Sequence, residues 1–96
     1  MDRSDDDLNG LCAGLLTLAT IDEMRAFLRD LCTVGELEAL SHRLSAARAL
    51  AAGDRTYAEI AATVGTSTTT VTRVAHWLRH GEGGYRLALD RIEAGA

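Results

Sequence analysis

The chain has 96 residues, a net charge of −4, no proline and 47% hydrophobic residues. This length fits one small domain, and a composition rich in leucine and alanine favours helices over strands. No apolar run approaches the roughly 20 residues that a membrane-spanning helix needs, and the acidic start MDRSDDD is unlike a signal peptide. The composition therefore predicts an all-helical cytoplasmic protein with no membrane partner.

The acidic and basic residues are separated along the chain. Residues 1–40 carry nine acidic residues against three arginines, whereas residues 41–96 carry seven arginines against five acidic residues. No acidic residue occurs between Ile60 and Gly81. Because nucleic-acid affinity depends on neutralising phosphates, this segment suits DNA better than the charge of the whole chain suggests.

Hydrophobic periodicity predicts six helices, at residues 5–17, 21–31, 34–52, 57–64, 68–80 and 85–94. Ser4 is the expected N-cap of the first helix. The pattern T-x-x-E, typical of a capping box, occurs at Thr20, Thr33 and Thr56. Gly53 is expected to end the third helix as a left-handed C′ residue.

The segment from Thr56 to Leu78 has the spacing of a helix-turn-helix. Two short helices are joined by a turn at Gly65, and Ala61 supplies a small side chain where the helices approach each other. Apolar residues at helical spacing are expected to fill the angle between the two helices: Ile60, Val64, Val71, Val74 and Leu78. In such a motif the second helix enters the DNA major groove.

The start of this second helix is rich in hydroxyl groups. Threonine is a poor helix former, so the stability of the helix does not explain why several threonines occur at its start. The alternative is that residues 56–78 form an ordinary helical hairpin. Hydroxyl and arginine side chains contact phosphates and base edges in protein–DNA complexes. The residues predicted to bind double-stranded DNA are Ser67, Thr68, Thr69, Thr70, Thr72, Arg73, His76 and Arg79.

About four-fifths of the chain resembles the Trp repressor family, and within it the YerC/YecD-type branch of TrpR-related proteins. The residues that carry the resemblance are Asp30–Thr33, Glu38–Leu40, Arg43–Leu44, Ala47–Arg48, Gly65–Thr68, Thr70–Val74, Leu78 and Gly84–Tyr85.

The resemblance implies a single six-helix domain over residues 1–96 that forms an intertwined homodimer. Residues 1–53 would be the dimerisation helices, 56–80 the helix-turn-helix and 85–94 a C-terminal helix. Among the predicted DNA contacts, Thr68, Thr69 and Thr72 match positions that touch DNA in the family. Ala58 stands where the family has an arginine, which removes one contact to the DNA backbone.

The resemblance also implies a site for a small-molecule effector. In the Trp repressor the corepressor lies between two arginines, which Arg43 and Arg73 match. Val74 and Trp77 replace a glycine and a serine there, and their bulk predicts that L-tryptophan is not the effector. The implied pocket is formed by Thr33, Arg43, Thr70, Arg73 and Trp77. Alternatively, the two arginines pair with nearby carboxylates, and Trp77 is a core residue.

Nothing in the sequence points to an enzyme or a cofactor. It has no nucleophile motif and no phosphate loop after a strand, and His76 and His80 lack a third metal ligand at a suitable spacing. Cys12 and Cys32 are expected to be small core residues. The leading prediction is a sequence-specific transcription regulator, with a repressor favoured over an activator. The alternative is a helical protein-interaction module that keeps the fold without reading DNA.

Overall fold

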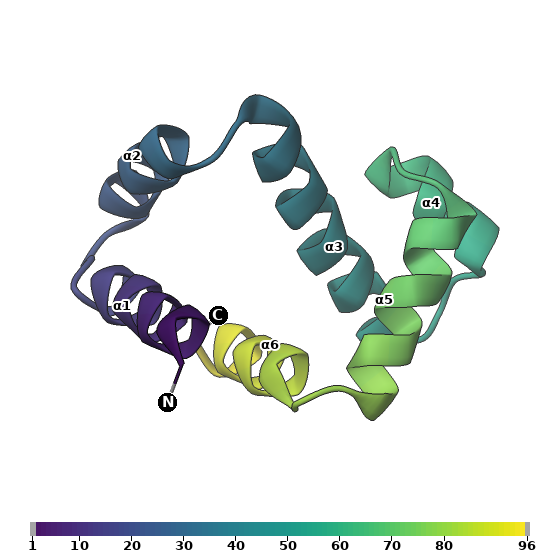
Figure 1. The fold of residues 1–96 in the computed structure, drawn as a ribbon. Helices are drawn as coiled ribbons and strands as arrows, with labels where there is room; N and C mark the ends of the chain where they lie inside the picture. Colours follow the sequence, from purple (N-terminus) through teal and green to yellow (C-terminus); the bar gives the residue numbers. More distant parts are fainter. Residues whose placement is uncertain (1, 96) are drawn as a thin grey trace. The chain divides into compact units, whose positions relative to one another are not determined.

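The computed structural model describes residues 2–95 and contains six α-helices with no strand among those residues (Figure 1). The helices are α1 (Arg3–Leu16), α2 (Ile21–Leu31), α3 (Val34–Ala52), α4 (Tyr57–Val64), α5 (Thr68–His80) and α6 (Gly84–Gly95). The predicted all-helical class is confirmed, and α2 to α5 have the predicted bounds. None of the helices between residues 2 and 95 combines the length and the hydropathy of a membrane span.

The first helix begins earlier than predicted. Its N-cap is Asp2 and not Ser4, because the Asp2 carboxylate accepts a hydrogen bond from the Asp5 N–H at 3.0 Å. A carboxylate at this position also complements the positive end of the helix dipole. Ser4 is therefore inside α1, where it is exposed.

Two of the helix starts show how the T-x-x-E pattern acts. At α3 the Glu36 N–H donates to the Thr33 hydroxyl at 3.1 Å, and the Glu36 carboxylate accepts from the Thr33 N–H at 2.8 Å. At α2 Thr20 also caps the helix, but the Glu23 carboxylate accepts from the Ala19 N–H at 2.8 Å instead. The pattern thus marks both starts correctly, although only the first forms the reciprocal box.

The chain divides into two compact units, Met1–Leu37 and Glu38–Ala96, with the boundary inside α3. In the C-terminal unit, buried residues of four helices form the core: Ala46, Ala47, Ile60, Ala61, Val71, Val74, Leu78 and Leu89. Small residues on α3 and α4 allow close helix packing, and α4 and α5 lie side by side (Figure 1). This core positions α5 with one face inward and one face toward solvent.

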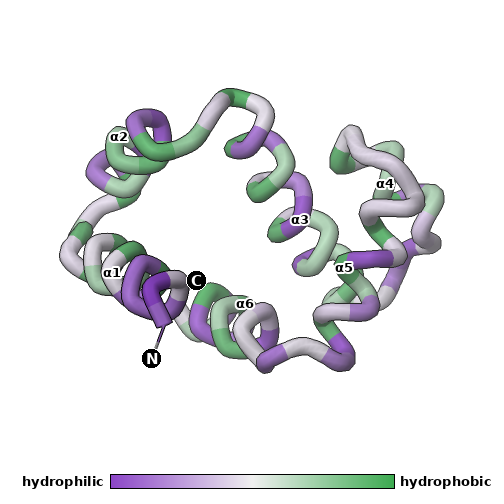
Figure 2. Tube along the Cα trace, in the orientation of Figure 1, coloured by the Kyte–Doolittle hydropathy of each residue, from purple (hydrophilic) through white to green (hydrophobic). Residues whose placement is uncertain are grey.

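The N-terminal unit has no buried residue among those that the structure describes. Hydrophobic and hydrophilic positions alternate along the turns of α1 and α2 (Figure 2), yet Leu16 is 86% exposed and Ile21 is 78% exposed. Cys12, which we expected in the core, is exposed, and Cys32 is half-buried. Helices in proteins normally gain most of their stability when such apolar stripes are buried. Here the stripes of α1 and α2 are partly or fully exposed, so another surface would have to cover them.

The link between α5 and α6 depends on a glycine. The Gly81 N–H donates to the Trp77 carbonyl at 2.9 Å, and a Cβ on Gly81 would collide with that same oxygen. We expect Gly81→Ala to lower the free energy of unfolding by about 1–3 kcal/mol, because the backbone must shift to relieve the overlap. Thermal denaturation of both proteins measures the difference.

Gly84→Ala is the matched control, since a Cβ on Gly84 would meet no heavy atom within 4 Å. This control should melt at or slightly above the temperature of the parent protein, because alanine favours the helix over glycine. Equal melting temperatures for the two variants would show that the Gly81 backbone adapts without cost.

Candidate nucleic-acid interface

The turn between α4 and α5 has the geometry that the sequence predicts. Gly65 ends α4 with φ 86° and ψ 36°, in the left-handed region that favours glycine. Its N–H donates to the Ala61 carbonyl at 2.9 Å, and the Thr66 N–H donates to the same oxygen at 3.0 Å. Ala61 is buried, so its small side chain lies where the two helices meet. These contacts hold the angle of the turn.

The start of α4 is held by a complete capping box. The Thr56 hydroxyl accepts from the Glu59 N–H at 3.1 Å, and the Glu59 carboxylate accepts from the Thr56 N–H at 2.8 Å. The bond from the Thr56 backbone, followed by that from its side chain, holds the pKa of Glu59 below its ordinary value. The box is therefore intact at neutral pH and keeps α4 in place beside α5.

Two hydroxyl groups at the start of α5 bond to each other. Ser67 caps the helix by accepting from the Thr70 N–H at 3.1 Å, and its own hydroxyl donates to Thr70 Oγ1 at 3.1 Å. Thr70 is half-buried, whereas Ser67 is exposed. Ser67 and Thr70, which are both predicted to contact DNA, therefore also stabilise the start of α5.

The other predicted contacts lie on the solvent side of α5. Val71, Val74, Ala75 and Leu78 are buried on its inner side. The exposed residues of the predicted interface are Thr68, Thr69, Thr72, Arg73, His76 and Arg79. Among residues 2–95, no group bonds to the hydroxyls of Thr68 and Thr69. This face therefore presents hydrogen-bonding groups and arginines to solvent, and α5 contains no acidic residue that would repel phosphate.

Thr72 has its hydroxyl oriented by the helix. It donates to the Thr68 carbonyl at 3.0 Å, which leaves its oxygen lone pairs available to accept a hydrogen bond from a base. An acceptor of fixed direction on an exposed helix face is suited to base readout.

Three aromatic rings follow on the same helix. The His76 and Trp77 rings meet edge-on with centroids 5.2 Å apart, and the His76 and His80 centroids are 5.3 Å apart. Trp77 is 53% exposed, so it is not the core residue that we considered. Within residues 2–95, no group of three histidine, cysteine or acidic side chains is placed to hold a metal.

A cavity of about 320 Å³ brings together residues that the sequence analysis assigned to an effector pocket. It is lined by Arg43, Thr70, Arg73, Val74, Trp77 and Tyr85. Neither arginine forms an ion pair with a carboxylate of residues 2–95. Buried Val74 and exposed Trp77 both line the cavity, so their bulk reduces its space without closing it.

The cavity differs from the predicted pocket in two residues. Thr33 belongs to the N-terminal unit and caps α3 there, so the structure does not place it at the cavity. Tyr85, which we did not predict, lines the cavity from the start of α6. In the sequence, Tyr85 stands out only as an aromatic residue directly after the glycine cluster. Hydrophobic periodicity alone does not assign such a residue to a site.

Comparison with known proteins points to one family. The family model described as Trp repressor protein matches residues 6–93. The uncharacterized protein YerC of Bacillus subtilis (strain 168) is 39% identical over 87 residues, which cover 91% of this chain and 83% of YerC.

Two solved structures have the same fold. A candidate Trp repressor from Staphylococcus aureus superposes with a TM-score of 0.86 at 40% identity, over 92% of this chain and 87% of that one. A TrpR-like protein from Eubacterium eligens superposes with a TM-score of 0.85 at 35% identity, over 92% of this chain and 90% of that one. The fold is that of DNA-binding regulators and not of enzymes. The chain belongs to the Trp repressor family and resembles its YerC-type members.

Proposed function

We propose that this protein is a sequence-specific DNA-binding transcription regulator that acts as a repressor in the cytoplasm. The observation that carries the proposal is the outer face of α5, which exposes threonine hydroxyls and two arginines without an acidic residue. Arg73, Arg79 and the helix start would fix the register on the phosphates, while Thr68, Thr69 and Thr72 would read base edges. Membership of the Trp repressor family supports this assignment.

We propose further that the active form is a homodimer. The support is the N-terminal unit, where α1 and α2 have apolar stripes but no buried residue. A second copy would cover these stripes and would present two copies of α5 to one DNA site. A twofold dimer of this kind reads a near-palindromic operator whose half-sites are about one helical turn apart.

Capture of genomic DNA tests the function directly. Purified protein is incubated with fragmented genomic DNA at physiological salt, and the retained fragments are sequenced. We expect enrichment of a short near-palindrome, with an affinity that falls steeply as salt rises because phosphate contacts release counterions. Retained DNA with the composition of the input would contradict sequence-specific binding.

A protein-interaction module is the second candidate function. The net charge of −4 and the exposed Ala58, at a position where the family has a DNA-contacting arginine, favour it. Such a module would keep the fold and would bind DNA only weakly at any sequence. The genomic capture separates the two functions, because only the regulator enriches a motif.

The cavity beside α5 supports an effector other than L-tryptophan. Two arginines without ion-pair partners suit an anionic group, whereas Val74 and Trp77 occupy space that a bulky indole would need. We expect L-tryptophan at millimolar concentration to leave the melting temperature unchanged, and a small anionic ligand to raise it. Arg43→Ala is the control, and the anionic ligand should no longer raise the melting temperature of this variant. A clear rise with L-tryptophan would contradict the altered pocket.

A further inference from the structure

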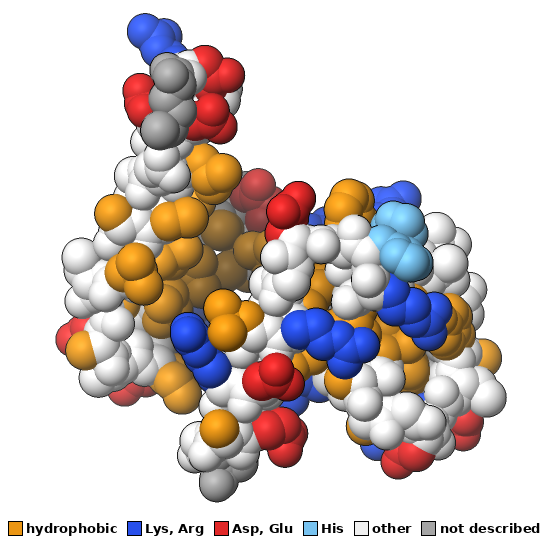
Figure 3. Space-filling model, turned by 90° about the horizontal axis from the view of Figure 1, so that it is seen from below, with side chains coloured by type: hydrophobic (Ala, Val, Ile, Leu, Met, Phe, Trp, Pro, Cys, Tyr) orange, Lys and Arg blue, Asp and Glu red, His pale blue; other side chains and the backbone are white. Residues whose placement is uncertain are grey.

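Two histidines lie one turn apart at the end of α5. His76 and His80 are four residues apart, both side chains are exposed, and their ring centroids are 5.3 Å apart. Neither ring forms a hydrogen bond or an ion pair with residues 2–95, so their nitrogen atoms are available to a ligand. Figure 3 shows histidine open to solvent beside arginine side chains. The pair is therefore accessible, and its nitrogens take no part in holding the fold.

The spacing of the two rings matches that of imidazoles bound to one metal ion. A zinc ion binds imidazole nitrogens at about 2.0–2.1 Å, and the ring centre lies about 1.1 Å beyond the nitrogen. With a tetrahedral angle between the two bonds, the ring centroids would be about 5.2 Å apart. The observed 5.3 Å agrees with this value. Two histidines four residues apart on one helix face are also the arrangement that helical zinc sites use.

The surroundings of the pair favour a bound cation. The Trp77 ring meets the His76 ring edge-on, at an interplanar angle of 86°, and restricts its rotation. His80 lies in the last turn of α5, where the negative end of the helix dipole stabilises positive charge. Arg79 in the same turn opposes a cation, but its guanidinium is exposed and is screened by solvent and salt.

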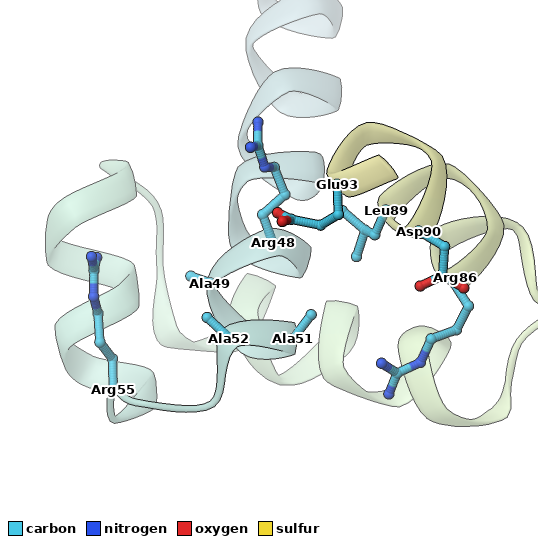
Figure 4. A pocket seen from close by; sticks show the side chains of 9 residues that line it. All are labelled: Arg48, Ala49, Ala51, Ala52, Arg55, Arg86, Leu89, Asp90 and Glu93. Atoms are coloured by element: carbon cyan, nitrogen blue, oxygen red, sulfur yellow. The ribbon is translucent and has the colours of Figure 1, made fainter. Parts of the chain in front are cut away.

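The carboxylates of the C-terminal unit that share a groove form a poorer cation site. Asp90 and Glu93 of α6 line this groove together with Arg48, Arg55 and Arg86 (Figure 4). Three guanidinium groups against two carboxylates leave a net positive charge, which repels a metal ion. A metal ion is therefore expected at the histidine pair and not in this groove.

We propose that His76 and His80 bind a divalent transition-metal ion such as Zn²⁺ or Ni²⁺. Imidazole nitrogens favour these ions over Mg²⁺, which prefers oxygen ligands. The two histidines fill two coordination positions and water fills the others, so the ion binds reversibly and requires no third side chain. Because His76 follows Thr72 by one turn, the ion would add positive charge to the outer face of α5. An effect on DNA affinity rests on the proposed DNA-binding function.

The chain has one tryptophan, which can report on this site. The Trp77 and His76 ring centroids are 5.2 Å apart, so a bound Ni²⁺ ion is expected to quench the fluorescence of Trp77. In a titration of the full-length protein with Ni²⁺, we expect a saturable loss of fluorescence at one ion per chain. Excess Zn²⁺, which has a filled d shell, should displace Ni²⁺ and restore the fluorescence, whereas Mg²⁺ should not. His80→Gln should raise the Ni²⁺ concentration at half-quenching by about tenfold or more.

His42→Gln is the matched control, because it removes the remaining histidine of the chain, on α3, and leaves the pair intact. Its titration should coincide with that of the parent protein. Quenching that rises linearly with Ni²⁺, or an unchanged midpoint in His80→Gln, would overturn the metal site. A ratio of one ion per two chains would place the ion between copies and overturn a site on a single helix.

Operator binding tests the effect of the ion on DNA affinity. Fluorescence anisotropy with the captured operator should show about fivefold tighter binding in the presence of Zn²⁺, and no such gain for His80→Gln. Equal operator affinities with and without Zn²⁺, in a protein that passes the quenching test, would overturn this coupling and keep the metal site. Failure to enrich any operator would overturn the proposed function, and the quenching titration would still decide the metal site.

Discussion

Thr68→Ala combined with Thr72→Ala is expected to reduce affinity for the operator by about tenfold for each threonine that reads a base. The two side chains lie on the exposed face of α5, and the Thr72 hydroxyl is already oriented by its bond to the Thr68 carbonyl. A well-placed hydrogen bond to a base contributes about 1–3 kcal/mol of discrimination. Binding to random DNA should change little, because phosphate contacts remain. Fluorescence anisotropy with the captured operator and with a scrambled duplex measures both affinities.

The matched control replaces two serines on another helix of the same unit. Ser41→Ala with Ser45→Ala removes two exposed hydroxyl groups from α3 and should leave both affinities unchanged. A threonine variant that binds the operator as tightly as the parent protein would argue against base reading by α5. In that event the protein-interaction module would become the better assignment.

Leu16→Ala combined with Ile21→Ala has the second large expected effect. In a single chain these side chains are 86% and 78% exposed, so truncation should change the free energy of unfolding by less than about 0.5 kcal/mol. In a homodimer that buries them, each truncation costs about 2–5 kcal/mol. We expect the larger loss, together with dissociation to monomers. Urea denaturation at two protein concentrations, with ultracentrifugation, measures both.

Arg25→Ala is the control for this experiment, because it removes a long exposed side chain from α2 without removing apolar surface of the stripe. It should keep the parent stability and oligomeric state. If the double truncation behaves like this control at both concentrations, the apolar stripes of α1 and α2 are not covered by a second copy.

Local signals predicted the helices well. The bounds of α4 and α5 follow from Thr56, Gly65 and Ser67, whose caps and turn depend only on neighbours a few residues away. The start of α1 was harder to place from the sequence, because Asp2 and Ser4 are both good N-caps and the side chain that bonds to the helix decides between them.

Burial and the shape of the sites were harder to predict. Periodicity places Cys12 on an apolar stripe, but the exposed fraction depends on what packs against that stripe. Trp77 likewise resembles a core residue by type, yet it lies on the outer side of α5. A groove of about 650 Å³ is lined by Arg48 and its neighbours and by residues of α6, which are far apart in sequence, so no local pattern reveals it. The outer face of α5 was predictable because a single helix carries it.

No residue between Asp2 and Leu37 is buried, and this has a consequence for the amount of active regulator in the cell. If α1 and α2 become buried only on association, then dilution favours chains in which these two helices are open to proteolysis. Occupancy of a site that needs two copies of α5 then rises with about the square of the protein concentration when dimers are scarce. The dose response of the regulated gene would therefore have a threshold, even without an effector.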